Sequence, residues 1–108
     1  MRQAYVDANV ILRFLTGEPP ALAEQARAIF EAVDHGALKL LVDDIVVAEV
    51  VWVLDSFYGY EKRRIAQVVA QLLSHEGLVA EDEPGLMAAL RLFADKNVDL
   101  ADALVAVH

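Results

Sequence analysis

Near its N-terminus the chain reads Ala4-Tyr5-Val6-Asp7-Ala8-Asn9-Val10-Ile11-Leu12. A short apolar segment runs directly into an acid, and an apolar segment of helical character follows. This order predicts a β-strand over residues 3–7 and a short helix over residues 9–15. Ligands of open α/β sheets gather at the carboxyl ends of the strands. We therefore expect Asp7, at the end of the first strand, to mark the functional site.

The rest of the chain alternates helical and strand patterns, which indicates an α/β fold with a parallel sheet and helical crossovers. The segment from Ile45 to Leu54 is apolar nearly all round. Its β-branched residues favour a strand, whereas its length favours a buried helix that runs on to Tyr58, and we interpret it as a helix. Strands are predicted over residues 39–42 and 78–80, and further helices over residues 20–35, 61–74, 81–95 and from residue 99 onward.

Length and composition narrow the class of protein. A chain of 108 residues fits a single domain over residues 1–108. The 57% of hydrophobic residues and the mean hydropathy of +0.40 supply a core and leave apolar surface for a partner. Without a membrane-length apolar run, an export signal or a cysteine, the chain is expected to be cytoplasmic and to lack disulfides and thiolate metal sites.

The net charge of −8 bears on nucleic-acid binding, because it has the wrong sign for holding a polyanion by charge alone. Bound cations or a small basic patch would have to meet the phosphates. The cluster Lys62-Arg63-Arg64 is the only basic patch, and it is more typical of a solvated helix face than of a phosphate site.

Glu49 is the sharpest local signal, because it is the lone acid in the apolar run of ten residues from Ile45 to Leu54. A carboxylate that is buried without a partner is costly, and such a group is normally paired, protonated or bound to a metal. A salt bridge to an arginine such as Arg13 explains Glu49 as well as a metal does, so both alternatives stay open.

Asp7, Asp99 and Asp102 also have structural explanations. An Asp that follows a strand commonly caps the next helix, and Asn9 could share this role with Asp7. The spacing of Asp99 and Asp102 also describes a capping pair, which is the better explanation of Asp99. Asp102 is harder to dismiss, because its neighbours are apolar and indicate a largely buried helix.

Asp7, Glu49 and Asp102 are stronger evidence for a metal site together than each of them is alone. If the fold brings the three carboxylates together, their mutual repulsion demands a cation. Oxygen ligands in a chain without cysteine indicate Mg²⁺ or Mn²⁺ rather than zinc. His35 and His75 precede glycines at helix C-termini, where a positive charge suits the helix dipole, and we do not expect them to bind a metal.

Several other chemistries are excluded. The chain has no Gly-rich phosphate loop and no Gly-x-Ser-x-Gly nucleophile turn. Aspartyl-phosphate phosphatases also begin with a strand that ends in Asp, but they carry a second Asp two residues later, where this chain has Asn9.

Three stretches together resemble PIN-domain nucleases and, among them, the VapC-type toxins of bacterial and archaeal toxin–antitoxin pairs. They are Tyr5 to Leu15, Val46 to Leu54 and Val98 to Ala106, and their order and separation match the family across the whole chain. The resemblance implies a three-layer PIN-like fold with a parallel sheet flanked by helices. It also implies a further strand with another acid after His108, so the last strand and one site residue would be missing.

The resemblance assigns roles to individual residues. It implies that Asp7, Glu49 and Asp102 are catalytic, metal-binding acids, that Asp99 is an accessory metal ligand, and that Asn9 supports Asp7. The implied reaction is hydrolysis of RNA phosphodiester bonds by water that Mg²⁺ or Mn²⁺ activates. The implied partners are RNA, an antitoxin whose basic segment covers the acidic pocket, and a second copy of the chain in a homodimer.

Two alternative functions stay open. A non-catalytic PIN module would use the same surface to bind RNA or protein, and the missing final acid and the scarcity of basic residues favour it. A purely structural α/β domain would use these acids only as helix caps and in salt bridges.

Overall fold

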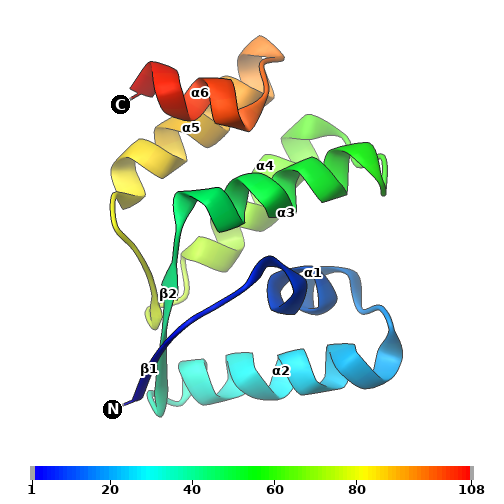
Figure 1. The fold of residues 1–108 in the computed structure, drawn as a ribbon, viewed down its shortest axis with the longest axis vertical. Coiled ribbons are helices and arrows are strands. Elements are labelled where there is room, and N and C mark those ends of the chain that lie inside the picture. The colour runs from blue at the N-terminus through cyan, green and yellow to red at the C-terminus, as the bar shows by residue number, and fades with distance from the viewer. Residues whose placement is uncertain (1, 108) are drawn as a thin grey trace.

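Three parallel strands form the sheet of this protein in the computed structural model, which describes residues 2–107 (Figure 1). The strands are β1 (Arg2–Tyr5), β2 (Leu38–Val42) and β3 (Leu78–Ala80), in the order β1-β2-β3. The predicted parallel sheet is confirmed, and β1 and β3 form its edges. His108 lies outside the described residues, so the predicted helix from residue 99 onward is not tested at that position.

Helices flank the sheet, as the alternating sequence pattern predicts. In Figure 1, α1 and α2 lie together at the bottom, α5 and α6 at the top, and α3 and α4 between them. Each predicted helix is confirmed, with every predicted bound within two residues of the observed one. Among residues 2–107, none of the helices combines the length and the hydropathy that a membrane span requires. The bounds are α1 (Ala8–Thr16), α2 (Pro20–Asp34), α3 (Asp44–Ser56), α4 (Lys62–Leu73), α5 (Glu83–Lys96) and α6 (Leu100–Val107).

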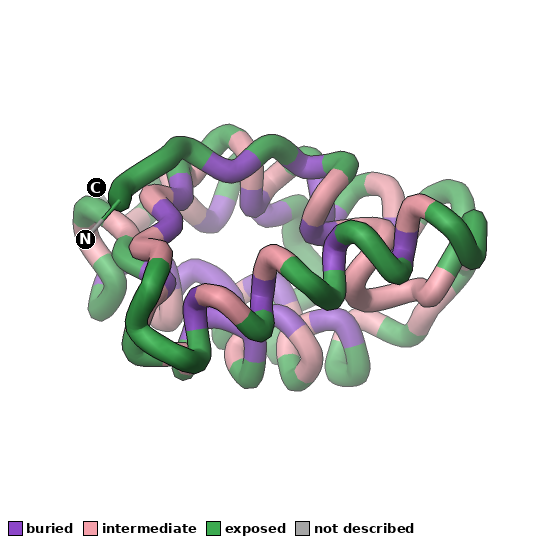
Figure 2. The backbone as a smooth tube through the Cα atoms, turned by 90° about the horizontal axis from the view of Figure 1, so that it is seen from below, coloured by how far each residue is buried: buried purple, intermediate pink, exposed green. Residues whose placement is uncertain are grey.

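One core joins the helices to the sheet. Buried and exposed residues alternate along each helix in Figure 2, because each helix turns one side to this core. Phe14 of α1 and Phe30 of α2 stack with ring centroids 4.1 Å apart. The ring of His75, after α4, lies in a T-shaped arrangement with both, and its Nδ1 donates to Asp34 Oδ1 at 2.7 Å. This histidine therefore ties the end of α4 to α2.

The environment of α3 corrects one expectation. The helix buries Val47, Val50, Val51 and Leu54, but its opposite side faces outward, with Ile45 82% and Trp52 67% exposed. The helix covers the core from outside, between α1 and α6, so the prediction that it is buried all round is wrong.

Candidate functional site

Asp7 joins β1 to α1 at the carboxyl end of the sheet. The backbone N–H of Val6 still donates to Leu41 O at 3.1 Å, and Asp7 follows directly. Asp7 Oδ1 accepts a hydrogen bond from the backbone N–H of Val10 at 3.0 Å, so the predicted capping alternative is confirmed. The side chain is nevertheless exposed. Because a carboxylate has several lone-pair sites, the cap bond leaves acceptor capacity for a ligand.

Glu49 lies on the outward side of α3, and its side chain is exposed. The desolvation penalty on which the prediction for Glu49 relied therefore does not arise, because solvent reaches the carboxylate. The alternative salt bridge to Arg13 is not formed either. The ion pairs among residues 2–107 are Arg27–Glu24, Arg63–Asp95 and His75–Asp34.

Asp99 and Asp102 lie at the beginning of α6. The Asp99 carbonyl accepts from the backbone N–H of Ala103 at 2.9 Å, which starts the helix. Both aspartate side chains are exposed, and α6 buries only Leu100 and Ala103, so the expectation of a largely buried helix around Asp102 is wrong. The sequence of α6 is apolar, but only one side of it meets the core.

The fold brings the helices that carry these acids into contact, with α3 packed against both α1 and α6. The carboxylate oxygens suit hard cations such as Mg²⁺. However, no group of three or more His, Cys, Asp or Glu side chains within residues 2–107 is placed to hold a metal ion. The arrangement of Asp7, Glu49, Asp99 and Asp102 therefore does not amount to a metal centre, and their role as ligands stays a prediction.

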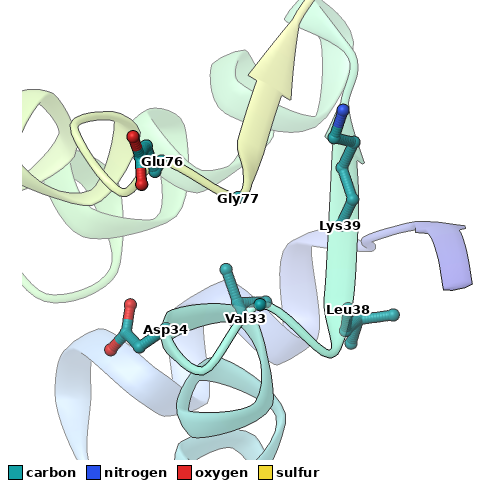
Figure 3. Close-up of a pocket in the computed structure, with 7 residues that line it drawn as sticks. Val33, Asp34, Leu38, Lys39, Glu76 and Gly77 are labelled. Carbon is teal, nitrogen blue, oxygen red and sulfur yellow. The ribbon is translucent and has the colours of Figure 1, made fainter. Parts of the chain in front are cut away.

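A cavity of about 380 Å³ lies at the opposite end of the sheet, where α2 ends and β2 and β3 begin (Figure 3). Asp34 and Glu76 lie on one side of it, while Lys39 extends along β2 away from them. Ligands of open α/β sheets bind at the carboxyl ends of strands. This cavity, at the amino ends, is therefore not assigned to the candidate site.

A groove of about 320 Å³ lies between α1 and α3 and includes Asn9 in its wall. Asp7 itself lines a separate cavity of about 450 Å³ beside β1 and α2. Arg13 and Thr16 continue along α1 on the same side as Asn9, because residues four and seven apart share a helix face. The opposite wall comes from α3 and the turn after it. Asn9 and Arg13 were named from the sequence for other reasons, and no sequence pattern predicted the groove itself. A signal that could have found it is the concentration of aromatic residues after α3. The wall residues are Val53, Phe57 and Tyr58.

Known proteins provide an independent comparison. The chain matches the PIN domain family over residues 4–108. It is 30% identical over 102 residues to "VapC ribonuclease" of Aquifex aeolicus (strain VF5), an alignment that covers 94% of this chain and 75% of that protein. No solved structure was found to match it. The match over nearly the whole chain agrees with the parallel sheet and the three acidic stretches, and it shows that this chain belongs to the PIN domain family.

Proposed function

We propose that this protein is a metal-dependent endoribonuclease, the toxin of a toxin–antitoxin pair, which hydrolyses RNA phosphodiester bonds. The observation that carries the proposal is the position of Asp7 at the carboxyl end of β1, in a chain related to a VapC ribonuclease. Asp7, Glu49 and Asp102 would be the catalytic acids and, with Asp99, the ligands of Mg²⁺ or Mn²⁺. Asn9 would support Asp7.

The exposure of the acids fits a polymeric substrate. Small-molecule sites are concave and bury most of the ligand, whereas Asp7, Glu49 and Asp102 are all open to solvent. An RNA chain could reach such a surface without a lid. The cap bond to Val10 also restrains the orientation of the Asp7 carboxylate, because one oxygen is held by the backbone of α1.

The test is cleavage of a labelled RNA pool by the purified chain in Mn²⁺ and in EDTA. We expect cleavage in Mn²⁺ alone, and its loss in Glu49→Gln and Asp102→Asn. Glu31→Gln, at an exposed glutamate of α2, is the matched control and should cleave normally. Full activity of both site variants would contradict the assigned roles.

The proposed function also includes protein partners, which would bind the outer side of α3. Ile45 and Trp52 precede and follow Glu49 by four and three residues, so they share its side of α3. Exposed apolar surface around an acid suits either a second copy of the chain or the basic, amphipathic segment of an antitoxin. Cleavage of cellular RNA would place this activity in the cytoplasm.

A second candidate function is a non-catalytic module that binds RNA. It is favoured by the finding that the acids within residues 2–107 do not form a metal centre. RNA binding without turnover in any metal would support this candidate over the nuclease.

A further inference from the structure

The segment from Phe57 to Arg64 concentrates side chains that suit nucleic acid. It contains three of the chain's eight aromatic residues and three of its nine lysine and arginine residues. The Phe57 and Tyr58 ring centroids lie 5.0 Å apart, those of Tyr58 and Tyr60 lie 5.9 Å apart, and Arg64 Cζ lies 4.7 Å from the Tyr60 centroid. Phe57, Tyr58, Tyr60 and Arg64 thus form a continuous row, which we call the aromatic row.

The aromatic row is continuous with the groove between α1 and α3. Phe57 and Tyr58 line the groove as well as the row, and Asn9 and Arg13 line the groove on the side of α1. Asn9 is two residues from Asp7. The groove therefore joins Asn9 and Arg13 of α1 to the aromatic rings and, through Tyr60, to the guanidinium of Arg64.

The stability of α4 does not explain why three cations lie in its first turn. Lys62, Arg63 and Arg64 form the first turn of α4, where the helix dipole disfavours positive charge, and no acid lies in that turn. The Arg63 side chain is 81% exposed, and its NH2 group is 3.9 Å from Asp95 Oδ1. Lys62 Nζ lies 4.7 Å from the Phe93 ring centroid and Arg63 faces Asp95, so Arg64, beside Tyr60, is the cation that the aromatic row offers to an anionic ligand.

We propose that the groove and the aromatic row bind a single-stranded segment of RNA beside the bond to be cleaved. Bases would stack on Phe57 and the tyrosine rings, and phosphates would meet Arg13 and Arg64. Sites for single-stranded nucleic acid combine aromatic stacking platforms with cations that follow the backbone. In duplex RNA the bases are already stacked and cannot reach the rings. An acidic peptide would satisfy the cations but would leave the Phe57 ring, 77% exposed, without a stacking partner.

The test measures binding rather than cleavage, in EDTA, with a labelled single-stranded RNA oligonucleotide and a duplex of the same sequence. Loss of one stacking platform in Phe57→Ser should weaken single-strand binding about tenfold and leave duplex binding unchanged. Arg13→Gln should reduce the slope of log K against log salt by about 0.7, the contribution of one phosphate contact on a single strand. Arg27→Gln removes the same charge from an exposed α2 pair with Glu24 and should change neither quantity.

The proposal would be overturned if Phe57→Ser and Arg13→Gln bound the single strand as tightly as the Arg27→Gln control does. An equal loss in all three variants would also overturn it, because it would reveal attraction by overall charge. Should Phe57→Ser fail to fold, Arg64→Gln takes its place with the same expected change in salt slope.

The proposal takes RNA as the ligand from the proposed function, yet the two fail separately. Groove-dependent binding without cleavage in Mn²⁺ would reject the nuclease and keep the binding site. Cleavage in Mn²⁺, combined with RNA binding that does not depend on Phe57 and Arg13, would reject the binding site and keep the nuclease.

Discussion

Asp7 combines a structural role and a proposed catalytic role, and two substitutions separate them. Asp7→Asn keeps a side-chain oxygen that can accept the hydrogen bond from the backbone N–H of Val10, since Asn and Asp are equally good N-caps. It removes only the negative charge. Asp7→Ala removes both the cap and the charge. If Asp7 acts in catalysis through its charge, both variants lose cleavage, but the second loses much more stability than the first.

The expected stability changes follow from the contacts of Asp7. Loss of an N-cap bond costs about 1 kcal/mol. Asp7→Asn loses only the attraction between an exposed carboxylate and the dipole of α1, about 0.3 kcal/mol. For a domain of this size, 1 kcal/mol lowers Tm by about 4 °C. We therefore expect Tm to fall by about 4 °C in Asp7→Ala and by about 1 °C in Asp7→Asn.

Thermal unfolding followed by circular dichroism, together with cleavage of labelled RNA in Mn²⁺, checks both parts. Asp82→Asn is the matched control, because Asp82 Oδ1 caps α5 by accepting from Gly85 N at 3.1 Å, and this variant should cleave RNA normally. Full cleavage by Asp7→Asn would refute a catalytic role for the Asp7 charge. An unchanged Tm in Asp7→Ala would refute the contribution assigned to the cap.

Other substitutions test the fold and the proposed dimer. Gly77→Ala should lower the free energy of unfolding by about 1–3 kcal/mol in denaturant titration, because the new Cβ would lie 2.5 Å from Cγ1 of Val33, whose branched side chain cannot turn away. Asn97→Ala should cost about 1 kcal/mol in the same titration, since Asn97 ends α5 in the left-handed conformation with φ of 55°. Trp52→Arg should convert a homodimer to a monomer in analytical ultracentrifugation without unfolding the chain, because Trp52 is 67% exposed; a dimer that survives this change would use another surface.

Local sequence patterns were sufficient to predict the order of the elements and the parallel sheet. The segment after Asp43 was ambiguous between strand and helix, and its length correctly favoured the helix α3. The burial of Glu49 was predicted wrongly from the same segment. Apolar neighbours normally indicate a core, but Ile45 and Trp52 are exposed, so apolar residues on the outer side of α3 concealed its periodicity. Only the packing of the other helices shows which side faces outward.

The groove between α1 and α3 could not be predicted from motif spacing. Its walls come from segments that are far apart in the sequence, and no pattern within either segment shows that Arg13 lies across from Phe57. The aromatic row was also missed because the predicted end of α3 lay two residues too late. The helix ends at Ser56 rather than at Tyr58, so Phe57 belongs to the turn that leads to Gly59, which has φ of 68°.

α3 is the element that the proposed activities share, and its two sides are used differently. The core needs only the inner residues, such as Val50 and Leu54, which are almost fully buried. Glu49, Trp52 and Phe57 lie outside that core. Substitution of exposed residues away from caps and networks usually changes stability little. Cleavage, dimerisation and RNA binding should therefore be separable by single changes on one helix and the turn after it, in a protein that stays folded throughout.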